Sequence, residues 1–220
     1  MEAHLPSSGQ TPGDYPSRFE GFDVLEQAHA WDPVTAGTVL RRLAPMPPLR
    51  FFDPAHERVA RPMLNLLLDQ REEPRVPVFE MIDQRLAELT TDGWHYEDMP
   101  PDPKAWTRSL EGLDEDARVR NGRGFAECDE LEQTKLMQAV ADLGSDTWHD
   151  MPASRVWSLW TRYACSAFYS HPWVWNEIGF PGPAYPRGYK NRFVRAGESA
   201  ALEPFEVRDQ HPEDPTEGQL

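Results

Sequence analysis

The chain has 220 residues, which is enough for one domain with a substantial core. It carries 37 acidic residues against 22 lysines and arginines, so its formal net charge is -15. This balance argues against non-specific binding of nucleic acid and against docking on anionic lipid, because both need a basic face. No apolar run approaches the roughly 18 residues of a membrane span, and we expect none.

The first 48 residues are expected to form a largely irregular N-terminal arm. Its beginning is acidic and rich in proline, glycine and serine, and it lacks a basic segment followed by an apolar one. We therefore predict no signal peptide, which makes the cytoplasm the default location. Asp32 followed by Pro33 favours a short helix near the end of the arm, because aspartate caps a helix and proline suits its first turn.

Helical periodicity dominates the next part of the chain. The Asp-Pro start recurs at 53–54, and the helix that follows contains Pro62, which should kink it or split it in two. A second amphipathic helix is predicted after Val76-Pro77. The segment 90–103 has the composition of a loop.

Three further helices are predicted. One runs from about 103 to 113, and the charged segment 114–124 follows and ends it at Gly122 and Gly124. The next begins at Asp129, which has the spacing of a capping box with Glu132. The last begins near Pro152; it is apolar on most of its circumference and is therefore expected to be central.

These patterns predict an all-α fold: a single helical domain of about five or six helices with long, aromatic, Pro- and Gly-rich loops. We expect the domain to span 49–196, between the arm at 1–48 and an acidic, flexible tail at 197–220. Cys128 and Cys165 fit no zinc or redox spacing. We interpret them as two buried thiols, although a disulfide between them is geometrically feasible.

No residue can be assigned to catalysis, cofactor binding or metal binding. The chain has no Gly-rich phosphate loop and no nucleophile elbow, and its histidines and carboxylates lack metal-ligand spacing on a helix. His149 and Asp150 are adjacent and would point apart on a helix. Glu177 lies among aromatics and is an acid or base candidate, but a simpler interpretation is that it accepts hydrogen bonds from loop N–H groups.

The stretch from Phe168 to Phe193 is the most unusual part of the sequence. Its aromatic residues lie on a backbone that proline and glycine turn repeatedly, and it ends in a basic island. Aromatics with arginine are typical of interface hot spots; the alternative is ordinary packing, with charge balance against the acidic tail. We predict a partner interface made of Trp173, Trp175, Glu177, Phe180, Tyr185, Arg187, Tyr189, Lys190 and Arg192.

The segment FYSHPWVWNEIGFPGPAYPRGY resembles the closing motif of the gluconate 2-dehydrogenase subunit 3 family. LRFFDPAHERVARPMLNLLL and PVFEMIDQRLAEL resemble its first two helices. The stretch from Trp106 through GFAECDELEQTKLMQAVA is similar to a later region of the family. The matching positions there are Leu113, Asp114, Ala117, Gly124 and Phe125. The resemblance covers about 49–192.

This resemblance implies a non-catalytic small, or gamma, subunit of an oxidoreductase complex that oxidises sugars or glycosides. The large subunit would be a flavoprotein of the glucose-methanol-choline type that carries FAD, and a cytochrome c often takes the electrons. The small subunit of the family supports folding, stability and export of the large one, commonly through a twin-arginine signal that this sequence lacks. Export with a signal-bearing partner therefore stays open.

Two other functions also stay open. In the first alternative, the chain is a dedicated chaperone that is absent from the mature complex. In the second alternative, the chain is a stand-alone enzyme that uses Glu177 or the histidines.

Overall fold

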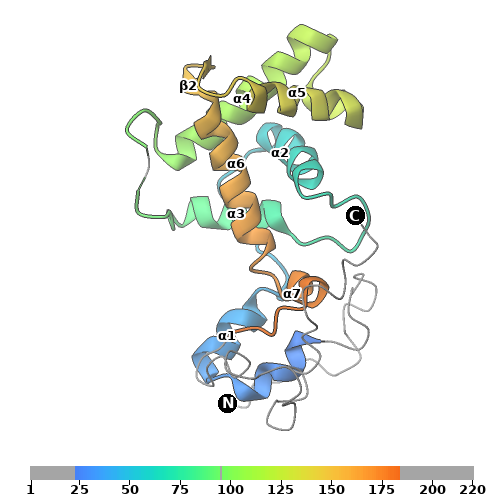
Figure 1. Cartoon of the computed structure of the whole chain (residues 1–220), viewed down its shortest axis with the longest axis vertical. Coiled ribbons are helices and arrows are strands. Elements are labelled where there is room, and N and C mark those ends of the chain that lie inside the picture. The colour runs from blue at the N-terminus through green and yellow to red at the C-terminus, as the bar shows by residue number, and fades with distance from the viewer. Residues whose placement is uncertain (1–22, 95, 184–220) are drawn as a thin grey trace, which may run out of the picture. The chain divides into compact units, whose positions relative to one another are not determined.

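The computed structural model describes residues 23–94 and 96–183, which form helices joined by irregular connections (Figure 1). The predicted all-α class is confirmed, since the strands in these ranges amount to one two-stranded pair. The described residues gather in two compact units. The larger unit is 45–168; the described parts of the smaller unit are 23–44 and 169–183. The predicted tail at 197–220 lies outside the described residues.

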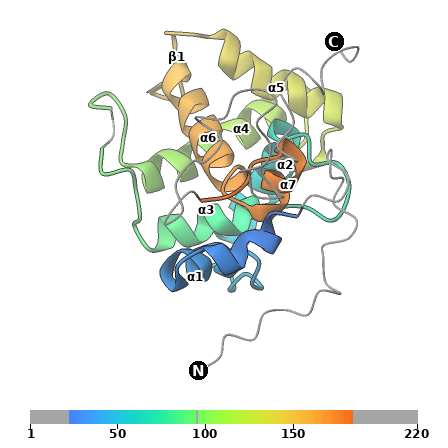
Figure 2. The same ribbon diagram turned by 60° about the horizontal axis from the view of Figure 1, so that its bottom comes forward.

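The larger unit is built around the helix predicted to be central. This helix, α6, contacts each of the other four α-helices of the unit and lies beside α4 in both views (Figure 1 and Figure 2). The unit consists of α2 (Pro54–Leu67), α3 (Val78–Ala87), α4 (Asp102–Asn121), the 3-10 helix η2 (Phe125–Glu127), α5 (Glu130–Asp142), β1 (Thr147–Trp148), β2 (Met151–Pro152) and α6 (Ala153–Phe168).

Aromatic side chains of α4 and α6 form the centre of this unit. The rings of Trp106 and Tyr163 meet edge to face with their centroids 5.7 Å apart, and both side chains are buried. The indole N–H of Trp160 donates to the hydroxyl of Ser109 at 2.9 Å, so a fully buried polar group on each helix is paired.

A buried carboxylate orders the segment before α2. Asp83 of α3 is 2% exposed and accepts hydrogen bonds from three consecutive backbone N–H groups. The donors are Arg50 at 2.8 Å to Oδ2, and Phe51 and Phe52 at 3.0 and 2.8 Å to Oδ1. Burying a carboxylate without hydrogen-bond donors is energetically unfavourable, and these three bonds compensate for the lost hydration. They also fix the Phe52 ring, which stacks on Phe79.

Helix boundaries confirm some sequence predictions and correct others. Asp53 and Asp129 cap α2 and α5 as predicted. Helix α2 runs unbroken past Pro62, which excludes the predicted split. The predicted end of the next helix near 113 is wrong, because α4 continues to Asn121. Buried Ala117 belongs to this extension. Gly122, one of the two glycines predicted to end the helix, closes it at a φ of 72°.

Two smaller expectations also change. Cys128 and Cys165 are both free, but only Cys128 is buried; Cys165 is exposed on α6, so the prediction of two buried thiols is wrong. The predicted all-α fold contained no strands, yet β1 and β2 form a short antiparallel hairpin, with Trp148 opposite Met151.

The smaller unit joins the two ends of the described chain. It contains the 3-10 helix η1 (Val24–Ala30), α1 (Pro33–Arg41) and α7 (Pro172–Ile178). Asp32 caps α1 as predicted, accepting from the N–H groups of Val34 and Thr35 at 3.0 and 3.3 Å. The core of this unit is formed by Val24, Trp31, Val39 and Trp175.

Candidate partner-binding surfaces

The aromatic stretch that we predicted as an interface is described as far as residue 183, within the smaller unit. Trp175 is 5% exposed, and its indole N–H donates to the carbonyl of Tyr169 at 2.7 Å. Phe180 packs against the same core with its ring centroid 5.3 Å from that of Trp175. These two aromatics therefore face inward and hold the stretch in shape.

The other predicted interface residues are placed differently. Trp173 and Glu177 lie on α7 and are half-buried. Tyr185, Arg187, Tyr189, Lys190 and Arg192 lie outside the described residues. The assignment of these residues to an interface stays a prediction.

Polar contacts connect α7 to η1 and α1. The side-chain oxygen of Asn176 accepts from the N–H of Val24 at 2.7 Å. Arg42 donates from Nη1 to the carbonyl of Ser170 at 2.7 Å, and its guanidinium lies over the Trp175 ring at 5.7 Å. The aromatic stretch is thus anchored on residues more than a hundred positions earlier in the chain.

His171 caps α7 and is 1% exposed. Its Nδ1 accepts from the N–H of Trp173 at 3.3 Å. Burial lowers the pKa of His171 to about 4, because the charged imidazolium would lose its hydration; the positive charge of Arg42 lowers it further. His171 is therefore neutral at physiological pH and serves as a structural acceptor.

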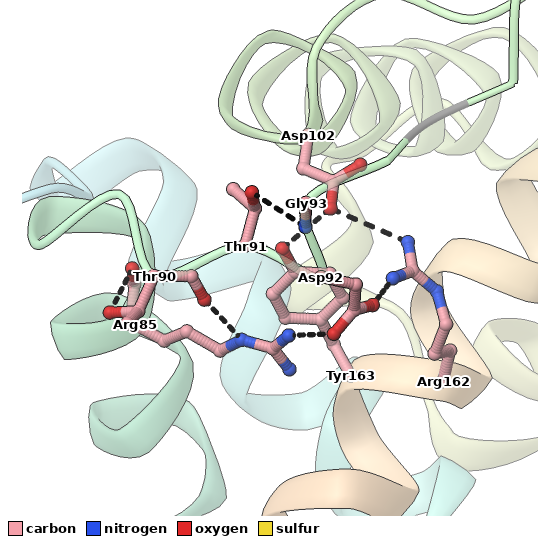
Figure 3. A network of polar contacts seen from close by, with 8 residues as sticks. All are labelled: Arg85, Thr90, Thr91, Asp92, Gly93, Asp102, Arg162 and Tyr163. Atoms are coloured by element: carbon pink, nitrogen blue, oxygen red, sulfur yellow. Dashed lines mark hydrogen bonds and ion pairs between the residues drawn. The ribbon is translucent and has the colours of Figure 1, made fainter.

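A second polar cluster lies in the larger unit, where the connection between α3 and α4 meets α6 (Figure 3). Asp92 of this connection forms ion pairs with both Arg85 of α3 and Arg162 of α6. Asp102, buried at the start of α4, accepts from the Tyr163 hydroxyl at 2.6 Å and lies 3.4 Å from Nη2 of Arg162. The cluster therefore ties the connection to three helices.

Tyr163 remains a neutral hydrogen-bond donor in this cluster. Its burial, together with the bonded carboxylate of Asp102, raises the pKa of Tyr163 well above its usual value. The guanidinium groups of Arg85 and Arg162 lie over its ring at 4.3 and 5.1 Å. An arrangement in which each charge faces a partner serves to fix geometry rather than to transfer protons.

The cluster supports a group of aromatic and basic side chains that we name the Trp94 surface, made of Trp94, Tyr96 and Arg155. The rings of Trp94 and Tyr96 are perpendicular with centroids 5.1 Å apart, and Arg155 of α6 lies 3.6 Å over the Tyr96 ring. The sequence predicted this connection as a loop and assigned it no function. The signal in the sequence that could have indicated this surface was the presence of two aromatic residues, Trp94 and Tyr96, within an otherwise polar loop.

His149 and Asp150 form the turn of the β1–β2 hairpin rather than part of a helix, with φ values of 46° and 55°. Nε2 of His149 lies 3.1 Å from a carboxylate oxygen of Asp116, and Nδ1 lies 3.7 Å from Glu115. Since both ring nitrogens face carboxylates of α4, this histidine holds the hairpin against that helix. The same Asp116 accepts from the indole N–H of Trp148 at 2.8 Å.

The larger unit also contains a cavity of about 320 Å³, lined by polar and charged side chains together with a few apolar residues such as Val76 and Phe79. Arg61, which lines it, is paired with Glu57 and Glu80 at 2.6 and 2.7 Å. The charge of this arginine is therefore already neutralised within the chain. In 23–94 and 96–183, no group of three or more histidine, cysteine or acidic side chains could hold a metal ion.

Comparison with known protein families shows where this sequence belongs. The family described as Gluconate 2-dehydrogenase subunit 3 matches residues 55–182, more than half of the chain. The chain belongs to this family. No curated protein and no solved structure matches the sequence.

The range of the gluconate 2-dehydrogenase subunit 3 match includes nearly the whole of α2 and all of α3 to α7, and with them the Trp94 surface. Helices η1 and α1 precede it, although they supply the core against which α7 packs. Helix α7, at the end of the matched range, is thus held in this chain by residues outside that range. Among the helices that the structure describes, none has the length and apolarity of a membrane span.

Proposed function

We propose that this chain is a non-catalytic accessory subunit that binds and stabilises a FAD-dependent sugar or glycoside dehydrogenase and helps it mature. Membership of the gluconate 2-dehydrogenase subunit 3 family, over 55–182, carries this proposal. An exposed aromatic and arginine surface on a fixed connection supports it, because such surfaces are enriched in protein interfaces.

The partner in this proposal is a large flavoprotein subunit of the glucose-methanol-choline type. FAD belongs to that subunit, where it oxidises a sugar hydroxyl, and the electrons pass to a cytochrome c or to another electron acceptor. The cellular location of the pair depends on the partner in this proposal. The two proteins stay in the cytoplasm, or they are exported together if the partner carries an export signal.

Co-expression tests the proposal directly. The flavoprotein of the same organism is produced with and without this chain, and its soluble yield, FAD content and dehydrogenase activity are measured. We expect all three to depend on the chain, and the two proteins to co-purify in fixed stoichiometry. A flavoprotein that is soluble, FAD-loaded and fully active alone would overturn the proposal.

The same preparation separates a subunit from a dedicated chaperone. A chaperone raises the yield of the flavoprotein but is absent from the purified, active enzyme. A subunit remains in it through gel filtration, and its removal lowers stability or activity.

A further inference from the structure

Trp94 is unusual among the aromatic residues of the larger unit because half of it is exposed. Its relative exposure is 50%, whereas Trp106, Trp148 and Trp160 of the same unit are buried. Within the described residues its indole N–H makes no hydrogen bond, so the ring offers both an apolar face and a donor. This combination is why tryptophan is enriched at interfaces.

Arg155 places an unused hydrogen-bonding group beside this ring pair. Its guanidinium is stacked over Tyr96, and the nearest carboxylate, Asp98, is 3.8 Å from Nε. In the described parts of the chain, neither Nη1 nor Nη2 of Arg155 has a hydrogen-bond partner. A planar guanidinium with two free N–H groups fits a carboxylate through two parallel hydrogen bonds.

The connection that carries Trp94 is fixed before any partner binds. Asp92, two residues earlier, is paired with Arg85 and Arg162 of two different helices. Arg162 also lies over the Trp94 ring at 5.3 Å. Side chains that are already ordered lose little conformational entropy on association, which favours their use as anchors.

We propose that Trp94, Tyr96 and Arg155 form a docking surface for a protein segment that presents an aspartate or glutamate beside an apolar side chain. The partner carboxylate accepts two hydrogen bonds from Nη1 and Nη2 of Arg155, and the apolar side chain covers the exposed face of Trp94. This inference rests on the proposed function, in which the large flavoprotein subunit supplies the segment. A protein is favoured over a nucleic acid because the chain has a net charge of -15.

Binding of purified large subunit to variants of the full chain tests this surface. Trp94→Ala and Arg155→Glu are each expected to weaken binding by at least about tenfold, since hot-spot truncations commonly cost more than a factor of ten. Arg155→Lys should lie between wild type and Arg155→Glu, because lysine keeps the charge but loses the planar pair of donors. Wild-type affinity should also fall with salt more steeply than that of Arg155→Glu.

Matched controls come from exposed residues elsewhere in the same unit. Leu131→Ala on α5 removes an apolar side chain that is 62% exposed, and Arg58→Glu reverses an exposed charge on α2. Both controls should bind like wild type. Thermal unfolding by circular dichroism confirms that every variant is folded before its affinity is compared.

The outcomes separate this inference from the proposed function. If wild type does not bind the large subunit, both are overturned. If wild type binds and the Trp94 and Arg155 variants bind equally well, the docking surface is overturned while the accessory role stands. Equal losses in the two controls, or binding of a single-stranded oligonucleotide that depends on Trp94 and Arg155, would also overturn the proposed surface.

Discussion

At the scale of single residues, burial decides what the polar side chains do. Asp83 accepts hydrogen bonds from three backbone N–H groups, Asp102 accepts one from a tyrosine hydroxyl, and His171 caps a helix as a neutral ring. The sequence predicted the caps at Asp32 and Asp53, because a cap needs only the residues that follow it. It could not predict the roles of Asp83 or Asp102, whose partners lie tens of positions away.

His171 should make stability depend on pH. Its folded pKa of about 4 lies below its unfolded value of about 6.5, so the unfolded state binds more protons between these values. The stabilisation is complete above pH 6.5 and is lost as pH falls toward 4. Between pH 7.5 and 5 we expect a loss of about 2 kcal/mol in the free energy of unfolding.

The variant His171→Asn isolates this contribution. Asparagine can cap α7 but does not titrate, so the difference in unfolding free energy between variant and wild type should shrink as pH falls. Urea unfolding at pH 7.5 and pH 5 measures both proteins. Parallel losses in the two would show that other groups cause the acid sensitivity.

At the scale of elements, local rules predicted where helices begin better than where they end. Charged residues after 113 read as a terminator, but buried Ala117 and the pair of Asp114 with Arg118 at 2.8 Å extend α4 by two turns. Pro62 did not split α2, because buried residues on both sides, such as Val59 and Met63, hold the two halves in one helix. Tertiary contacts thus overrode signals that were correct in isolation.

The candidate surfaces also show that local sequence signals can be overridden by residues far away in the chain. Sequence composition pointed to the aromatic stretch, yet Trp175 packs inward because Trp31 and Val24, far away in the chain, complete a core around it. The Trp94 surface was missed because Arg155, which stacks on it, comes from another helix.

The contact between α4 and the β1–β2 hairpin predicts that one substitution in α4 destabilises the wild-type chain but stabilises a variant of the hairpin. A Cβ added at Gly112 would lie 2.7 Å from Cδ2 of His149, whose ring is held by Asp116 and Glu115. Gly112→Ala should therefore destabilise the chain by about 1–3 kcal/mol, because the overpacked ring must move.

The same substitution should behave differently once the ring is removed. In a His149→Ala background, Gly112→Ala should stabilise by up to about 1 kcal/mol, since alanine is the better helix former. A double-mutant cycle by urea unfolding measures both steps. An equal cost in both backgrounds would mean that the ring of His149 is not the obstacle.

At the scale of the whole molecule, the two units differ in how the chain builds them. The larger unit is one continuous segment, 45–168, whereas the smaller unit combines segments from both sides of it. A continuous segment with its own aromatic core has what an independent domain needs.

We therefore predict that the fragment 45–168 folds when expressed alone. It should show a helical circular dichroism spectrum and a single cooperative thermal transition, as small domains usually do. A fragment with the spectrum of an unfolded chain, under conditions in which the full chain is folded, would contradict this prediction.

The carboxylate of Asp83 has a consequence for how this protein can change during evolution. It binds the backbone N–H groups of residues 50–52, which every amino acid except proline supplies. Substitutions within that segment can therefore leave its path intact, whereas loss of the aspartate removes the acceptor of three backbone N–H groups at once, that of buried Phe52 among them. In diverging relatives, we expect the acidic residue of α3 to persist longer than the phenylalanines it positions.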